Sequence, residues 1–260
     1  MAGDATAADL RGRILDGELL LGMFLDLGSA VSAEIVAHAG FDWIVLDAEH
    51  GALGAAPLFG QLQAVAGGSA APFVRVPSPR SELLGWALDA GAAGIVVPRS
   101  DSVRDVLAAL SASRYGATRG AAPGVRAARF GRDRSYLPNA DERRVLLIQI
   151  ETVPALAAVE QIAAIDGVDV LFLGPTDLAR SLGLAGVAAD HPQILEAAER
   201  IAAAAQAAGK AAGVYVDDPD HAADYRRLGY SVIGSGFEAG LVRDAAGARL
   251  ARLAERARGA

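Results

Sequence analysis

The sequence predicts an α/β fold, a closed barrel of parallel strands in which a helix follows each strand. Three observations predict it. The chain has 260 residues, and (β/α)8 barrels commonly contain about 250 residues in one domain. Short apolar runs typical of buried strands alternate with segments whose apolar residues recur at helical spacing. Small residues follow these segments, as is common where a helix ends. We therefore expect residues 1–260 to form a single (β/α)8 domain.

The strand-like segments come in regular order along the chain. They are Leu19–Leu27, Trp43–Asp47, Pro72–Val76, Ala93–Pro98, Val145–Glu151, Val170–Leu173, Ala212–Val216 and Ser231–Gly234. Helical spacing is clearest in the segments Ser32–His38, Pro57–Val65, Ser81–Asp89 and Val103–Leu110. Because helices and strands alternate, the sheet should be parallel, and the carboxyl ends of all strands should lie on one face of the barrel.

Two segments depart from this repeat. Residues 115–140 form a long connection rich in glycine and arginine, longer than an ordinary barrel loop. We expect it to cover part of the barrel mouth, the alternative being a flexible insertion with solvated charges. Residues 238–258 predict a long amphipathic helix, which would pack on its own barrel or on a partner subunit.

Composition excludes several classes of function. The chain has no cysteine, so disulfides and thiolate metal sites are excluded. Its formal net charge of -7, without a basic run, argues against nucleic acid as a partner. No apolar run reaches the roughly 20 residues of a membrane span, and the N-terminus lacks the pattern of a signal peptide. We expect a soluble cytoplasmic protein.

The position of the single lysine argues against imine chemistry. Lys210 lies between a predicted helix and the next strand, a junction that faces away from the mouth of a barrel. Schiff-base catalysis would need a lysine at the mouth.

Polar side chains gather at the predicted carboxyl ends of four strands. They are Asp47, Glu49, His50, Arg75, Gln149, Glu151 and Asp177. Among them, Glu151 and Asp177 are the natural metal pair, because two carboxylates leave positions on Mg²⁺ or Mn²⁺ open for a chelating substrate. Each could instead cap the helix that follows it.

Arg75 lies in a strand that should be buried, where an unpaired guanidinium would cost several kcal/mol. Its anionic partner would be either Glu151 or a substrate carboxylate. The planar fork of arginine suits bidentate carboxylate recognition, which favours the substrate.

Four motifs in order resemble the HpcH/HpaI aldolase family over residues 22–241. The motifs are Gly40–His50, Val74–Arg75, Ile148–Thr152 and Leu173–Leu178. The resemblance implies a (β/α)8 barrel of the phosphoenolpyruvate/pyruvate superfamily type. It also implies a metal-dependent, class II aldolase that cleaves 4-hydroxy-2-oxo acids reversibly to pyruvate, or a related 2-oxo acid, and an aldehyde. A citramalyl- or malyl-CoA-type lyase and a non-catalytic barrel that binds 2-oxo acids are the alternatives.

The resemblance also implies roles for individual residues. Glu151 and Asp177 match the ligands of a divalent metal, Mg²⁺, Mn²⁺ or Co²⁺, and His50 with Asp47 matches a histidine–aspartate acid/base pair. Arg75 matches the arginine that contacts the 2-oxo acid. The remaining matched positions line the substrate site or surround it, and they are Phe24 on the acceptor side, Glu49, Gln149, Gly174, Pro175 and Thr176.

The family also implies a hexamer, a trimer of dimers in which the C-terminal helix crosses to its partner. Two positions depart from the family pattern. Ala48 stands where a glycine is usual between Asp47 and Glu49, and Phe24 replaces a commoner tryptophan. These departures concern the choice of aldehyde more than the metal site.

Overall fold

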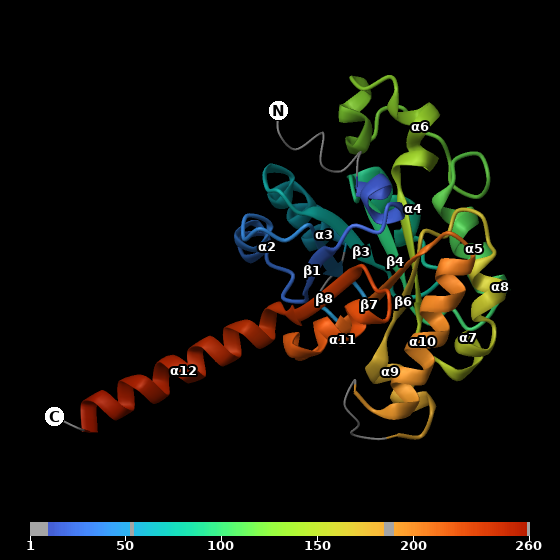
Figure 1. The fold of residues 1–260 in the computed structure, drawn as a ribbon. Coiled ribbons are helices and arrows are strands. Elements are labelled where there is room, and N and C mark those ends of the chain that lie inside the picture. Colours follow the sequence, from blue (N-terminus) through green and yellow to red (C-terminus); the bar gives the residue numbers. More distant parts are fainter. Residues whose placement is uncertain (1–9, 53–54, 185–189, 259–260) are drawn as a thin grey trace.

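Eight parallel strands close into a barrel in this computed structural model, which describes residues 10–52, 55–184 and 190–258. The strands pair in sequence order, and β8 closes the barrel against β1 (Figure 1). They are β1 (Leu20–Leu25), β2 (Trp43–Asp47), β3 (Ala71–Arg75), β4 (Gly94–Val97), β5 (Val145–Ile150), β6 (Val170–Leu173), β7 (Ala211–Val216) and β8 (Val232–Phe237). The predicted fold class is confirmed, and every predicted strand has a counterpart within a few residues of its expected bounds.

Helices connect the strands and cover the outside of the barrel (Figure 1). The α-helices are α2 (Ala30–Ala37), α3 (Ala55–Ala64), α4 (Leu83–Ala90), α5 (Val103–Ser113), α6 (Tyr136–Arg143), α7 (Val153–Ala157), α8 (Val159–Ala163), α9 (Pro175–Ser181), α10 (Pro192–Ala207), α11 (Ala222–Arg227) and α12 (Glu238–Arg258). Short 3-10 helices are η1 (Val65–Gly67), η2 (Arg126–Gly131) and η3 (Pro219–His221).

Side chains fill the inside of the barrel, so it is a packed core and not a pore. Alternate strand residues point inward, and large aromatic rings occupy the centre. The rings of Trp43 and Phe172 meet edge to face with centroids 6.1 Å apart, and Phe24 lies above them toward the mouth. A second cluster, built of aliphatic residues, lies between the strands and the helices. The chemistry is therefore restricted to the rim of the barrel.

The arginine-rich connection does not lie where we expected it. Residues 114–144 join α5 to β5, and the start of β5 lies at the end of the barrel opposite the mouth. Arg126 donates hydrogen bonds to the carbonyls of Leu62 and Ala90 at the carboxyl ends of α3 and α4. The segment lines a cavity of about 1120 Å³ together with Ala71 and Ala93, at the amino-terminal ends of β3 and β4. The prediction that it covers the mouth of its own barrel was wrong, because a connection from a helix to a strand reaches the amino-terminal end of that strand.

The C-terminal helix α12 extends away from the barrel (Figure 1). It begins where the Glu238 carboxylate accepts a hydrogen bond from the backbone N–H of Leu27. Most of the helix is exposed, including the apolar Leu250 and Leu253, which are 67% and 64% exposed. Within the described residues, no helix is both long and apolar enough to span a membrane.

Candidate active site

Three charged side chains form one side of the barrel mouth, which we call the paired side: Asp47, Glu49 and Arg75. Parallel pairing places Asp47 of β2 directly beside Arg75 of β3. The Arg75 guanidinium donates two hydrogen bonds to the Asp47 carboxylate, at 2.8 Å from Nε and 2.6 Å from Nη2. Its Nη1 lies 3.2 Å from the Glu49 carboxylate. The anionic partners of Arg75 are thus neither of the two we had weighed, although a bound carboxylate could still use its remaining N–H groups.

The two carboxylates of the paired side differ in their pKa. Burial acts to raise the pKa of Asp47, but the hydrogen bonds and charge of Arg75 outweigh it and hold this pKa below its usual value. Burial raises the pKa of Glu49 to about 7. The charge of Arg75 acts to lower this pKa, but the charges of Asp47 and Asp177 act to raise it. At neutral pH, Asp47 is therefore a fixed anion, whereas Glu49 can gain or lose a proton.

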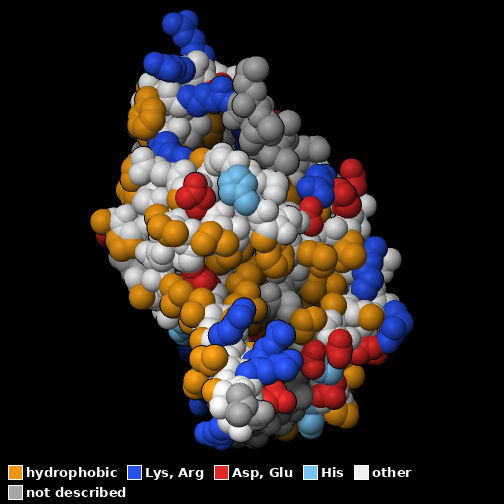
Figure 2. All heavy atoms as spheres, turned by 90° about the vertical axis from the view of Figure 1, so that its left-hand side faces the viewer, with side chains coloured by type: hydrophobic (Ala, Val, Ile, Leu, Met, Phe, Trp, Pro, Cys, Tyr) orange, Lys and Arg blue, Asp and Glu red, His pale blue; other side chains and the backbone are white. Residues whose placement is uncertain are grey.

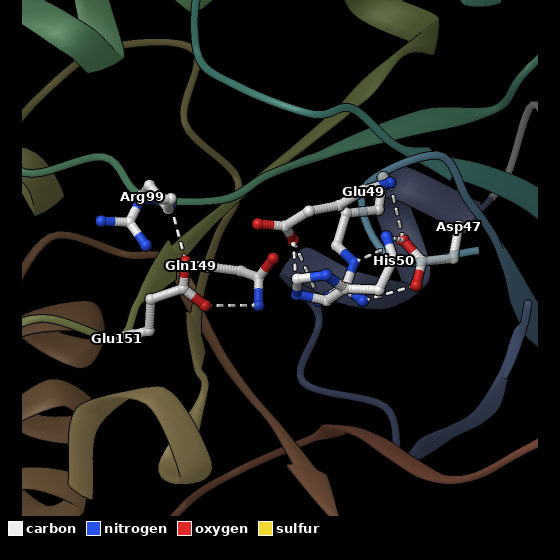
Figure 3. A network of polar contacts seen from close by, with 7 residues as sticks. Asp47, Glu49, His50, Arg99, Gln149 and Glu151 are labelled. Atoms are coloured by element: carbon white, nitrogen blue, oxygen red, sulfur yellow. Dashed lines mark hydrogen bonds and ion pairs between the residues drawn. The ribbon is translucent and has the colours of Figure 1, made fainter. Parts of the chain in front are cut away.

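His50 is an exposed residue next to the paired side of the mouth. Its side chain is 64% exposed, and Nε2 lies 3.8 Å from the Glu49 carboxylate (Figure 3). Asp47 accepts a hydrogen bond from the backbone N–H of His50, and its other partners are the Glu49 N–H and Arg75. The Asp47 carboxylate therefore fixes the position of the loop that carries His50, and Glu49 is the acid beside the imidazole. Asp47 thus acts on His50 through the backbone of the loop, and the carboxylate near the imidazole ring is that of Glu49.

The opposite side of the mouth, which we call the acidic side, consists of Gln149, Glu151 and Asp177. Glu151 follows β5, and its carboxylate accepts hydrogen bonds from the Arg99 backbone N–H at 2.6 Å and from Gln149 Nε2 at 2.9 Å (Figure 3). Glu151 is only 3% exposed, and Oε1 of Gln149 is buried without a hydrogen-bond partner. Asp177 lies in the first turn of α9 and is exposed.

Negative charge on the acidic side has no direct cationic side-chain partner among the hydrogen bonds and ion pairs of the described residues. Burial raises the pKa of Glu151 to about 7, and the charges of Glu49 and Asp177 add to this effect. A Cβ built on Gly174, which precedes Pro175 and Thr176 at the start of α9, would lie 2.8 Å from Glu151 Oε2. The glycine therefore leaves room directly beside the buried carboxylate.

These features fit a hard divalent cation. Carboxylate and amide oxygens are its preferred ligands, and a cation would relieve the repulsion between the carboxylates. The described residues contain no group of three or more His, Cys, Asp or Glu side chains that could hold a metal. Glu151 and Asp177, whose charges act on each other, are the two carboxylates of this side that could serve as ligands, with the remaining positions left to water and substrate.

An aromatic wall stands at the ends of β1 and β7. The Arg75 guanidinium lies 5.2 Å from the centre of the Phe24 ring, and the Tyr215 ring meets Phe24 edge to face with centroids 5.3 Å apart. Phe24 of β1 thus lies in the mouth, across the barrel from Glu151 after β5, and its role on the acceptor side stays a prediction.

Sequence reasoning missed two residues of the mouth. Arg99 contributes its backbone N–H to Glu151, and its φ of 49° is unusual for a residue other than glycine. No side-chain pattern could have indicated that role. Tyr215, in contrast, had a signal in the sequence, since it lies near the carboxyl end of a predicted strand.

Comparison with known proteins gives a consistent result. Residues 20–245 match the model of the family HpcH/HpaI aldolase/citrate lyase. A hydroxypyruvate/pyruvate aldolase of Paraburkholderia phytofirmans is 38% identical, over 86% of this chain and 89% of that protein. A 4-hydroxy-2-oxovalerate aldolase of Rhodococcus jostii is 39% identical, over 93% of this chain and 94% of the other. The crystal structure of an HpcH/HpaI aldolase/citrate lyase family protein from Burkholderia cenocepacia superposes with a TM-score of 0.89 at 37% identity, covering 95% of this chain and 99% of that one.

Proposed function

Because the chain belongs to the HpcH/HpaI aldolase/citrate lyase family, we propose that it cleaves 4-hydroxy-2-oxo acids reversibly to pyruvate, or a related 2-oxo acid, and an aldehyde. The observation that carries the proposal is the buried Glu151 carboxylate, which has no cationic side-chain partner among the ion pairs of the described residues, at the same barrel mouth as the cationic Arg75. A chelated 2-oxo acid would fit between them. Its carboxylate and keto oxygens would meet a cation on one side and the N–H donors of Arg75 on the other.

Glu151 and Asp177 would hold the divalent metal, Mg²⁺, Mn²⁺ or Co²⁺, with Gln149 beside them. When bound, such a metal supplies Lewis-acid stabilisation of negative charge on the keto oxygen. Arg75 adds to it, because its guanidinium is held by Asp47 and Glu49 before substrate arrives and so needs no reorganisation. The backbone around Gly174, Pro175 and Thr176 would line the 2-oxo acid on the side of α9.

His50 is the candidate base for the cleavage step. It would accept the proton of the substrate 4-hydroxyl, directly or through one water, while C4–O becomes a carbonyl group. The C3–C4 bond breaks, and its electron pair forms the enolate of pyruvate, whose negative charge Arg75 stabilises. Protonation at C3 completes the reaction. The 64% exposure of His50 places the base at the open side of the mouth, where an aldehyde can leave.

The test is a retro-aldol screen of 4-hydroxy-2-oxo acids in which released pyruvate is measured. Chelation should abolish pyruvate release, and Mg²⁺, Mn²⁺ or Co²⁺ should restore it. The variant Lys210→Ala should remain active, since Lys210 contributes to a small cavity at the amino-terminal ends of β7 and β8. Trapping of a pyruvate adduct on the protein with borohydride would contradict the proposal.

We also propose that the chain assembles through α12, as a trimer of dimers. Hydrophobic side chains gather on the face shown in Figure 2. Exposed apolar residues lie at the start of α12, in α2 and in the loop before α2, and they are Leu241, Val242, Val31, Ile35 and Leu27. An exposed apolar surface of this kind is typical of an interface between subunits. Light scattering that showed a monomer at micromolar concentration would contradict this assembly.

A further inference from the structure

Tyr215 belongs to the inner surface of the barrel at its mouth. Alternate residues of β7 point inward, and a Cβ built on Gly213 would lie 2.6 Å from the Phe172 ring in the barrel core. Tyr215 is two residues closer to the mouth, and its ring packs on Phe24, which is itself in contact with Arg75. The phenol therefore stands at the same barrel mouth as Arg75, whose charge acts on it.

The groups around the Tyr215 hydroxyl are mainly hydrogen-bond acceptors. Burial raises the pKa of Tyr215 well above its usual value, and the charge of Asp217, a hydrogen bond with it and the charge of Asp26 add to this effect. Tyr215 therefore stays protonated at neutral pH. One oxygen of Asp26 accepts a hydrogen bond from the Ala239 N–H at the start of α12, which fixes that side chain at the rim.

The neighbouring strand β8 leaves space next to the phenol. Gly234 pairs with Tyr215, and a Cβ there would lie 2.8 Å from the Trp43 ring, so the ring of Trp43 forms the floor. A Cβ built on Gly236, closer to the mouth, would meet no atom within 4 Å. A small molecule beside Gly236 would lie against the packed rings of Tyr215 and Phe24, which are in contact with each other.

We propose that Tyr215, flanked by Asp217 and Asp26, selects the aldehyde of the reaction and favours uncharged, hydroxylated aldehydes over those that carry a carboxylate. This inference rests on the proposed aldolase function. The hydroxyl groups of such an aldehyde would donate hydrogen bonds to the Tyr215 oxygen and to the two carboxylates.

The charges explain why a second carboxylate would be disfavoured. Of the three charged groups that act on Tyr215, Asp217 and Asp26 are negative, and the positive one is Arg75. The guanidinium of Arg75 is already held by Asp47 and Glu49, and the proposed function assigns its remaining donors to the 2-oxo acid. An aldehyde carboxylate would therefore meet two like charges without a free cation among these groups.

The experiment compares kcat/KM for addition of pyruvate to glyceraldehyde, propanal and succinic semialdehyde. Intrinsic reactivity differs among the three aldehydes, so the readout is the change in their ratios between wild type and variants. Tyr215→Phe keeps the ring and removes the hydroxyl, and it should lower the ratio of glyceraldehyde to propanal about tenfold, the effect of one good hydrogen bond. Asp217→Asn should raise the ratio of succinic semialdehyde to propanal severalfold.

Two matched variants serve as controls. Tyr136→Phe alters a tyrosine that donates to the Leu88 carbonyl at the carboxyl end of α4, and Asp220→Asn alters an exposed acid in η3. Both should keep the wild-type ratios. Unchanged ratios in Tyr215→Phe, or an unchanged ratio of succinic semialdehyde to propanal in Asp217→Asn, would overturn the assignment of Tyr215.

Failure of the aldolase function itself would look different. Exchange of the pyruvate C3 protons with deuterium needs no aldehyde. Absence of this exchange in the metal-loaded wild type, together with absence of product from every aldehyde, would refute the proposed function and the role of Tyr215 with it. Exchange with unaltered aldehyde ratios in Tyr215→Phe would refute the role of Tyr215 alone.

Discussion

The two sides of the barrel mouth contain similar acidic residues but differ in how their charge is balanced. On the paired side, Arg75 neutralises Asp47 and holds the Asp47 pKa below its usual value. On the acidic side, Glu151 is buried among other carboxylates, and its pKa rises to about 7. Buried carboxylates are normally paired with a cation or bound to a metal. Asp47 thus has its cation within the chain, whereas Glu151 has no cationic side-chain partner among the hydrogen bonds and ion pairs of the described residues, and we propose that a metal supplies one.

The largest effect should come from the acidic side. Glu151→Gln keeps the size of the side chain but removes the proposed metal ligand. We expect retro-aldol activity to fall about 10³-fold or more, because a catalytic metal supplies several kcal/mol and each 1.4 kcal/mol is about tenfold in rate. Steady-state kinetics at saturating Mn²⁺ measure this loss of activity. Glu160→Gln, which alters an exposed ion pair with Arg200, is the matched control and should be fully active.

His50 should give the next largest effect, because it is the proposed base at the edge of the paired side. His50→Ala should reduce cleavage by about 10²–10⁴-fold, the usual contribution of a general base. Pyruvate should still bind, and NMR follows the exchange of its C3 protons separately. His38→Ala changes an exposed histidine at the end of α2 and should behave as wild type. Cleavage at the wild-type rate by His50→Ala would remove this residue from the mechanism.

Arg75→Lys tests whether geometry matters on the paired side as well as charge. Lysine keeps the positive charge but loses the planar fork that holds Asp47 and reaches Glu49. We expect a loss of about 10²-fold in kcat/KM, typical of removing one preorganised donor. Arg80→Lys, at an exposed pair with Asp105, is the control. Nearly normal kinetics in Arg75→Lys would show that Arg75 has only a structural role.

Asp47→Asn should have the smallest effect on rate and a clear effect on stability. Activity should fall about tenfold, since Arg75 and the His50 loop lose their anchor but remain present. The free energy of unfolding should fall by about 2 kcal/mol at neutral pH, as expected for weakening a buried charged hydrogen bond.

The pH dependence of that stability difference follows from the direction of the shift. The pKa of Asp47 is lowered in the folded state, so its contribution is present above its unfolded pKa of about 3.9 and is lost as pH falls through the folded value. Denaturant unfolding of wild type and Asp47→Asn should therefore converge in acid. A difference that stayed constant from pH 7 to pH 3 would contradict the ion pair with Arg75.

Local sequence patterns were sufficient for much of the fold and for the position of the site. The bounds predicted for Trp43–Asp47 and for the helix Glu238–Arg258 agree with the structure, because the first is a continuous apolar run and the second is rich in alanine, leucine and arginine. Parallel topology then placed the polar ends of β2, β3 and β5 together. Residues 114–144 could also have been placed correctly from the sequence. They run from a predicted helix to the next strand, and in this fold such connections lie at the amino-terminal ends of the strands, opposite the mouth.

Contacts between strands were beyond local patterns. The sequence indicated that Arg75 needs an anion, but the choice of Asp47 and Glu49 depends on the register of β2 and β3. The hydrogen bond from Arg99 to Glu151 depends on a backbone conformation with a φ of 49°, for which no residue type gives a signal. The pKa of Glu151 depends on burial and on carboxylates from two other elements.

Direct titration with Mn²⁺ tests the difference between the two sides most simply. Calorimetry should show that the wild type binds one Mn²⁺ per chain and that pyruvate increases the affinity for Mn²⁺. In Glu151→Gln the affinity for Mn²⁺ should fall at least tenfold. Glu160→Gln should bind as the wild type does. Equal Mn²⁺ affinity in the wild type and in Glu151→Gln would contradict the proposal that the acidic side holds the cation.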